Sequence, residues 1–109
     1  NRSRMATFES MNTIEKTSEF NEWIENLRDH PAKLRIFNRL DRGALGNFGD
    51  CESVGEGISE MRIHYGPGYR VYFTRCNEVI YLLLIGGDKS TQTQDIARAK
   101  AIFKNLPKE

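Results

Sequence analysis

The stretch that most constrains the fold runs from residue 60 to residue 75 and reads EMRIHYGPGYRVYFTR. Residues 66–68 (Gly-Pro-Gly) are a turn signal. The residues on both sides alternate in polarity and are rich in β-branched and aromatic types, as strands require. The stretch therefore predicts a β-hairpin with a three-residue turn. A symmetric turn would place His64 opposite Arg70.

The two faces of this hairpin are expected to differ, because successive strand residues point to opposite sides of a sheet. One face would gather two guanidinium groups, an imidazole and a phenol, whereas a solvated strand face usually mixes Lys, Glu, Thr and Ser. This polar face is the first candidate for a functional site, and the other face is expected in the core. The polar face holds Glu60, Arg62, His64, Arg70 and Tyr72, and the apolar face holds Met61, Ile63, Tyr65, Tyr69, Val71 and Phe73.

Composition predicts one soluble globular domain, with 109 residues, 39% of them hydrophobic and 28% charged. No apolar run approaches the length of a membrane span or of a signal-peptide centre, so we expect a cytoplasmic protein. We interpret residues 1–10 as an expression remnant or flexible leader and residues 11–109 as the domain. Without Arg2 and Arg4 the formal charge falls from +1 to −1, so binding to nucleic acid would need a local basic patch.

The two cysteines, Cys51 and Cys76, have no repeated spacing, which favours reduced thiols over a disulfide framework. Together with His30 and His64 they also lack the spacing of metal ligands. We therefore expect neither a metal nor a cofactor.

The segment before the hairpin predicts an edge strand over Asn12–Thr17 and two helices that form an antiparallel hairpin. Ser18 is the expected N-cap of the first helix, and Pro31 is a good first residue for the second. The expected buried residues are Phe20, Trp23, Ile24 and Leu27 in the first helix and Leu34, Phe37, Leu40 and Ala44 in the second. On the other side of the second helix, a basic ridge of Arg35, Arg39 and Arg42 is either a solvated face or a set of phosphate contacts.

The segment after the helices predicts an irregular connection at 46–57 that could carry one short strand at 52–54. Beyond the hairpin, a tight turn at 76–77 would lead into a central strand at 78–85, which the glycines at 86 and 87 would end. That turn would place Tyr81 beside Tyr72 and bring Lys89 to the same side. A last helix, capped by Ser90 or Thr91, would bury Ile96, Ala99, Phe103 and Leu106 before Pro107. The expected order, β-α-α-β-β-β-α, describes an α+β fold whose sheet is mainly antiparallel.

Three groups of residues resemble the RelE/ParE superfamily of toxins from bacterial toxin–antitoxin modules, and most closely its HigB-like, phage Gp49-like addiction-module killer branch. They are Gly55-Glu56-Gly57 with residues 59–63 (SEMRI), residues 65–73 (YGPGYRVYF), and residues 86–92 (GGDKSTQ) with Asp95-Ile96. The resemblance covers nearly all of residues 13–106.

This resemblance implies a RelE-like fold and a small toxin that a cognate antitoxin neutralises, usually a helix-turn-helix protein encoded beside it. Many RelE- and HigB-like members cut mRNA in the ribosomal A site without a metal, whereas ParE-like members inhibit DNA gyrase. The basic positions of the nucleases match Arg62, His64, Arg70 and Lys89 here. The resemblance therefore implies a ribosome-dependent mRNA endonuclease. The alternatives are a gyrase inhibitor and a non-catalytic RNA-binding module.

The chemistry of metal-free RNA cleavage suggests a role for each of these residues. Arginine binds two phosphate oxygens and stays charged, so we expect Arg70 to hold the scissile phosphate with help from Arg62 and Lys89. His64 would transfer a proton, or would be a neutral strand residue at the rim of the sheet. Lys89 could also simply precede a helix cap.

Three aromatic or basic groups could support the substrate, and each also has a structural interpretation. Tyr72 or Tyr81 would stack on a base, or would simply pack within the sheet. Arg35, Arg39 and Arg42 would contact the substrate, or would form a solvated face. Arg62 and Arg70 could instead form structural ion pairs with Glu60 and Asp88, or line the groove that receives the antitoxin.

Overall fold

The computed structural model describes residues 12–78 and 80–107, which form a five-stranded sheet with three α-helices. The strands lie in the order β1-β5-β4-β3-β2; β1 runs parallel to β5, and the other neighbours are antiparallel. The predicted α+β class and mainly antiparallel sheet are thus confirmed. The elements are β1 (Thr13–Lys16), α2 (Ser18–Asn26), α3 (His30–Ala44), β2 (Cys51–Gly55), β3 (Ile58–Ile63), β4 (Tyr69–Arg75), β5 (Ile80–Asp88), the 3₁₀ turn η1 (Lys89–Thr91) and α4 (Gln92–Lys104).

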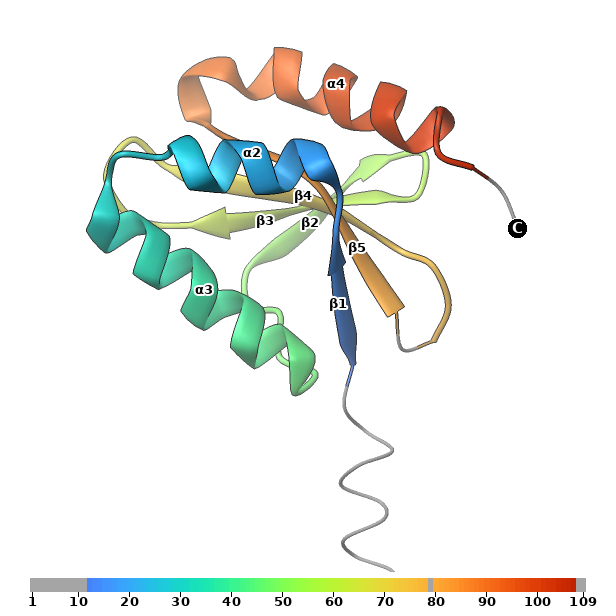
Figure 1. The fold of residues 1–109 in the computed structure, drawn as a ribbon, viewed down its shortest axis with the longest axis horizontal. Coiled ribbons are helices and arrows are strands. Elements are labelled where there is room, and N and C mark those ends of the chain that lie inside the picture. Colours follow the sequence, from blue (N-terminus) through green and yellow to red (C-terminus); the bar gives the residue numbers. More distant parts are fainter. Residues whose placement is uncertain (1–11, 79, 108–109) are drawn as a thin grey trace, which may run out of the picture.

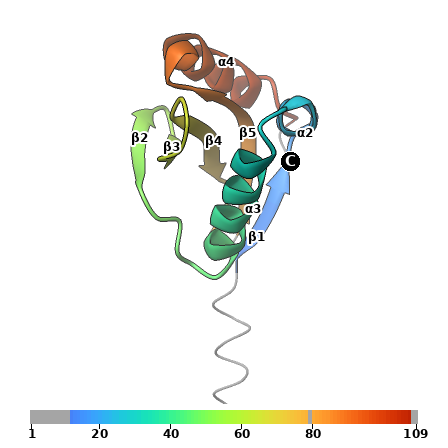
Figure 2. The ribbon, with the colours of Figure 1, turned by 90° about the vertical axis from the view of Figure 1, so that its left-hand side faces the viewer.

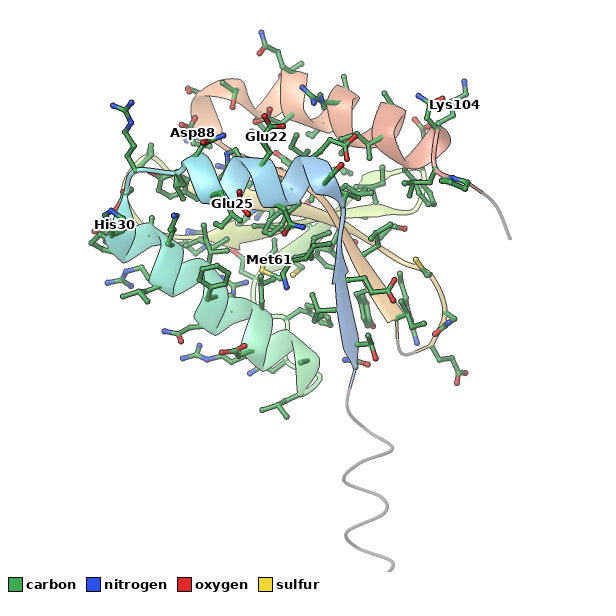
Figure 3. All side chains as sticks on the ribbon, viewed as in Figure 1. Glu22, Glu25, His30, Met61, Asp88 and Lys104 are labelled. Atoms are coloured by element: carbon green, nitrogen blue, oxygen red, sulfur yellow. The ribbon has the colours of Figure 1, made fainter. Side chains whose placement is uncertain are left out.

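The sheet separates two layers of helices (Figures 1 and 2). The helices α2 and α3 cover one face, where Phe20, Ile36 and Met61 are completely buried. Met61 lies at the centre of this packing in Figure 3. The helix α4 covers the other face through a smaller apolar cluster that includes Tyr72 and Ala99. No helix in residues 12–78 and 80–107 has the length and apolar character needed to cross a membrane.

The first half of the chain differs from its prediction in three respects. Thr17, and not Ser18, caps α2, because its Oγ1 accepts a hydrogen bond from the Phe20 N–H at 3.0 Å and donates to the Leu84 carbonyl at 2.8 Å. The helices α2 and α3 diverge from their connection and do not pack side by side (Figure 1). The short strand considered at 52–54 is present as β2, so the sheet contains one strand more than the expected order.

The buried side of α3 is rotated from the predicted one, and of the predicted residues only Leu40 is buried. Leu34 and Phe37 are 66% and 40% exposed. The side that faces the sheet carries Ala32, Ile36, Leu40 and Gly43. Gly43 leaves room for the ring of Phe48 from the connection after α3, because a Cβ at Gly43 would lie 2.6 Å from that ring.

The predicted hairpin is present, but its connection has five residues (64–68) instead of three. The observed register places Arg62 opposite Arg70 and Ile63 opposite Tyr69. The predicted register was therefore wrong by two positions. Since the side chains of a strand alternate with a period of two, a slip of two positions leaves every side chain on its predicted face.

The register between β4 and β5 was also wrong, and there the error changes faces. Arg75 lies opposite Tyr81, and an irregularity separates Tyr72 from Phe73. Tyr81 consequently does not lie beside Tyr72. It packs with Phe48 and Phe73 on the side of the sheet that α2 and α3 cover.

The end of β5 was predicted to break at Gly86 and Gly87, but the strand continues through both residues to Asp88. A Cβ at Gly86 would lie 2.6 Å from Cη2 of Trp23 in α2, and a Cβ at Gly87 would lie 2.7 Å from Cγ of Asp95 in α4. Helices press on the strand from both faces at this point, so glycine here serves close packing and does not end the strand.

The last helix has Thr91, one of the two predicted caps, in its N-cap position, although the Thr91 side chain makes no capping hydrogen bond. Asp88 caps η1 by accepting a hydrogen bond from the Ser90 N–H, and α4 follows from Gln92. Ala99 is buried as predicted, while Phe103 is 36% exposed. Ile96 and Leu106 are partly buried against the α4 face of the sheet.

Candidate functional site

The four residues predicted to be catalytic meet at one place. Arg62, His64, Arg70 and Lys89 line a hollow of about 500 Å³ at the end of the hairpin that carries the 64–68 connection. We call it the hairpin-end hollow; its other lining residues are Ile63, Tyr65, Gly66, Pro67, Gly68 and Tyr69. His30 and Asp88 mark this end of the molecule in Figure 3.

The side chains of Arg70 and Lys89 both approach Gly68. A Cβ at this residue would lie 3.3 Å from Arg70 Nη1 and 3.5 Å from Lys89 Cβ. Gly68 has φ +83°, a backbone conformation that glycine adopts readily. Arg70 Nη1 donates to the Gly68 carbonyl at 2.8 Å, which fixes the guanidinium. Lys89 is exposed and forms no ion pair with any residue in the described part of the chain.

A buried carboxylate lies behind these cations. Glu60 is 1% exposed, and its Oε2 accepts a hydrogen bond from Arg62 Nε at 3.0 Å. Its Oε1 accepts from Gln92 Nε2 at 2.8 Å and from the Tyr72 hydroxyl at 3.3 Å. Arg70 Nε lies 3.5 Å from the same oxygen, an ion-pair distance without hydrogen-bond geometry. We call Glu60, Arg62, Arg70, Tyr72 and Gln92 the Glu60 cluster.

The charge of Arg62 is largely compensated. Besides Glu60, its guanidinium forms a hydrogen-bonded ion pair with Glu52 and lies 3.8 Å from Asp50 Oδ1. The partner Asp88 considered in the sequence does not contribute, since its side chain caps η1. Of the two arginines in the hollow, Arg70 has fewer acidic partners, so its charge is less compensated than that of Arg62.

His64 has a carboxylate partner that the sequence reasoning missed. Its Nε2 lies 2.6 Å from Asp50 Oδ2. The imidazole is exposed, with 74% of its side-chain surface accessible. The hydrogen bond with His64 lowers the pKa of Asp50 below its ordinary value. Asp50 lies in the irregular connection before β2, and its only sequence signal was an acidic residue at the start of a short strand.

Neither of the two tyrosines expected to stack on a base lines the hairpin-end hollow. Tyr72 is completely buried under α4, and this burial raises the pKa of its hydroxyl well above the ordinary value. Tyr81 lies on the opposite face of the sheet, where it packs with Phe48 and Phe73, and the Arg75 guanidinium lies 5.7 Å from its ring centre. Both residues pack within the sheet, which is the structural interpretation considered from the sequence.

The three arginines of the basic ridge on α3 have different surroundings. Arg39 is structural: it donates to the carbonyls of Arg62 at 2.5 Å and Phe48 at 2.7 Å. The Arg35 guanidinium lies 4.4 Å from the centre of the Tyr65 ring. Arg42 is exposed. All three arginines line a second hollow of about 250 Å³ with Asn38, Ile63 and His64, so His64 borders both hollows.

The cysteines are free thiols in the structure; Cys51 is partly buried and Cys76 is exposed. Burial raises the pKa of the Cys51 thiol. Within residues 12–78 and 80–107, no three or more His, Cys, Asp or Glu side chains are grouped so that they could hold a metal ion.

Comparison with known proteins found a relative that matches most of the chain. The chain is 47% identical over 93 residues to an uncharacterized protein of Haemophilus influenzae. The aligned residues are 85% of this chain and 94% of that protein. Identity at this level over nearly all of both chains means that the chain belongs to the same family as that protein. No family model matches the sequence.

Proposed function

We propose that this protein is the toxin of a type II toxin–antitoxin module, of the HigB-like branch of the RelE/ParE superfamily, and that it cuts mRNA on the ribosome. The observation that carries the proposal is the gathering of Arg62, His64, Arg70 and Lys89 around one hollow. A five-stranded sheet between two layers of helices is compatible with the RelE-like topology that we propose for it.

The proposed reaction is attack by the ribose 2′-oxygen on the adjacent phosphorus. A bond forms from the 2′-oxygen to phosphorus while the bond from phosphorus to the 5′-oxygen breaks. The 2′-hydroxyl loses its proton to a base, and the departing 5′-oxygen receives one from an acid. The products are a 2′,3′-cyclic phosphate and a 5′-hydroxyl.

The side chains of the hairpin-end hollow fit the needs of this reaction. Arg70 and Lys89 would hold the phosphate oxygens as negative charge develops on them. His64 would exchange one of the two protons, with water exchanging the other. Arg62 would act mainly by holding Glu60 and Asp50, since three carboxylates already compensate its charge.

A path for the RNA beyond the scissile phosphate is suggested by the second hollow. It adjoins the first one at Ile63 and His64 and presents the exposed Arg42. A neighbouring phosphate of the RNA could lie in this hollow and contact Arg42. Such a contact would not depend on the RNA sequence.

The experiment that tests this proposal is incubation of the purified chain with translating ribosomes and labelled mRNA, followed by mapping of the 5′-hydroxyl ends. Lys89→Ala and Arg70→Ala should each reduce cleavage by about 10²–10³-fold, the usual cost of removing one group that stabilises developing charge. Circular dichroism would check that both variants fold.

Two matched controls are available at the opposite end of the molecule. Arg75 lies on the same strand as Arg70 and donates to the carbonyls of Asn77 and Glu78, and Lys104 lies at the far end of α4 from Lys89 (Figure 3). Their alanine variants should cleave like the wild type. Equal losses in all four variants, or intact mRNA with the wild type, would overturn the nuclease proposal.

A wider assay tests the toxin proposal itself. Induction of the chain should arrest growth, and co-expression of the neighbouring open reading frame, which we propose encodes a helix-turn-helix antitoxin, should restore it. If growth stops while mRNA stays intact, arrested DNA supercoiling would identify a gyrase inhibitor, and retention of uncut RNA would identify a binding module.

A further inference from the structure

The carboxylate of Asp50 lies where it can orient the imidazole of His64. Its carboxylate reaches His64 from a different strand connection, fourteen residues earlier in the chain, with 2.6 Å between Asp50 Oδ2 and His64 Nε2. His64 follows the last residue of β3 and has no other side-chain hydrogen bond within the described residues. The Asp50 carboxylate is therefore what holds the imidazole in one orientation.

The backbone around Asp50 is itself fixed. The Asp50 carbonyl accepts a hydrogen bond from the Arg62 N–H at 2.9 Å, which ties this connection to β3. The Arg39 guanidinium comes from α3 and binds the carbonyls of Phe48, Arg62 and, at 3.4 Å, Asp50. Such a clamp explains how a residue outside the regular strands can hold a precise distance to a side chain on β3.

We infer that Asp50 is a positioning residue that, in the neutral form of His64, keeps the proton on Nε2, so that Nδ1 is the nitrogen that exchanges a proton with substrate. A carboxylate accepts the Nε2–H bond, and in neutral imidazole the other nitrogen then carries the lone pair. The catalytic part of this inference depends on the proposed function, whereas the orientation of His64 does not.

The groups that face the pair set its electrostatics. Arg62 Nη1 lies 3.8 Å from Asp50 Oδ1, and Arg39 approaches from α3. Glu52 and Glu60 face Arg62 in turn and offset its charge. Asp50 thus remains a carboxylate at neutral pH, as its lowered pKa requires, and can accept the imidazole N–H.

The first test is long-range ¹H–¹⁵N NMR of the histidine rings at a pH where they are neutral. His64 in the wild type should show the Nε2–H tautomer, and Asp50→Ala should convert it to a mixture of tautomers. His30, which starts α3, is an internal reference that should not change. Glu52→Ala is the matched control, because it removes an acidic partner of Arg62 that does not contact His64.

Unchanged His64 signals in Asp50→Ala, or equal changes in Glu52→Ala, would overturn the inference. This readout does not require the protein to be a nuclease. If the wild type fails to cut mRNA but His64 responds to Asp50→Ala as expected, the proposed function fails and the positioning of His64 stands.

The second test applies if the wild type cuts mRNA. Asp50→Ala should reduce the maximal cleavage rate about 10–100-fold, with little change in the apparent affinity for the ribosome, because it acts through His64. In a His64→Ala background the same substitution should have almost no further effect. Additive losses in the double variant would show that Asp50 does not act through His64.

Discussion

The polar face of the hairpin has two ends with opposite properties, although both have the same alternation in the sequence. At one end the Glu60 cluster lies under α4, where Glu60 and Tyr72 are 1% and 0% exposed. At the other end His64 and Lys89 are exposed beside the hairpin-end hollow. Arg62 and Arg70 belong to both. The difference shows that strand periodicity selects a face, whereas the packed helix decides which part of that face is structural.

The largest expected effect is the loss of folding stability when the buried Glu60 is replaced, compared with the loss when an exposed acidic residue is replaced. Glu60→Ala should lower the free energy of unfolding by about 3–5 kcal/mol, because it leaves Arg62 and Arg70 without their buried carboxylate. Glu52→Ala removes a partner of Arg62 whose side chain is 62% exposed, and should cost at most about 1 kcal/mol. Urea unfolding measures both, and similar losses would show that the two ends do not differ in this way.

The second prediction tests the exposed end through its backbone. Gly68→Ala should destabilise the chain by about 1 kcal/mol or more because φ is +83° there. It should also displace Arg70, whose Nη1 would lie 3.3 Å from the new Cβ. Gly66→Ala carries similar strain, with φ +57°, but its Cβ would lie no closer than 3.7 Å to any other group.

Unfolding and mRNA cleavage measured on the same two glycine variants separate strain from site geometry. Both variants should lose stability, while only Gly68→Ala should also lose most of the cleavage. A loss of cleavage in Gly66→Ala as large as that in Gly68→Ala would mean that the connection as a whole matters, and not the spacing of Arg70 and Lys89.

The sequence predicted the hairpin and its faces well because that prediction depends on a period of two. The observed slip of two positions left Arg62 and Arg70 on the predicted side. Between β4 and β5 the connection was longer than predicted and the register irregular, so Tyr81 changed faces. A local pattern does not contain the length of a connection, and the offset of three positions where residues 73–75 pair with residues 81–83 reverses the side chains of that part of β5.

Other errors came from contacts between residues far apart in the chain. The sequence predicted that the strand ends at Gly86 and Gly87, because nothing in the neighbouring residues shows that Trp23 and Asp95 occupy the space beside these glycines. Asp50 read as one polar residue in an irregular segment, because its meeting with His64 depends on the pairing of β2 with β3. The charges of the candidate site were visible in the sequence, but their partners were not.

A smaller effect is expected within the Glu60 cluster. Tyr72→Phe removes one hydroxyl, which donates to Glu60 at 3.3 Å, and leaves the ring in place. Glu60 keeps its hydrogen bonds from Arg62 and Gln92, so the free energy of unfolding should fall by only about 0.5–1.5 kcal/mol. Because Tyr72 is buried, mRNA cleavage should not change. If Tyr72→Phe folds but no longer cuts mRNA, the Tyr72 hydroxyl takes part in the site.

The smallest expected effect concerns the pH dependence of the exposed pair. The hydrogen bond with His64 lowers the pKa of Asp50 in the folded chain relative to the unfolded one. A group with a lowered folded pKa stabilises the fold above its unfolded pKa, near 4, and this contribution disappears as the pH falls through the folded value. The wild type should therefore be more stable than Asp50→Asn at pH 5–7, and the difference should shrink below about pH 4. Other carboxylates titrate in both proteins and cancel in the comparison. Urea unfolding of the two proteins across this range measures the difference. A constant difference down to pH 2 would mean that Asp50 contributes through the shape of the connection, and that its charge does not hold His64.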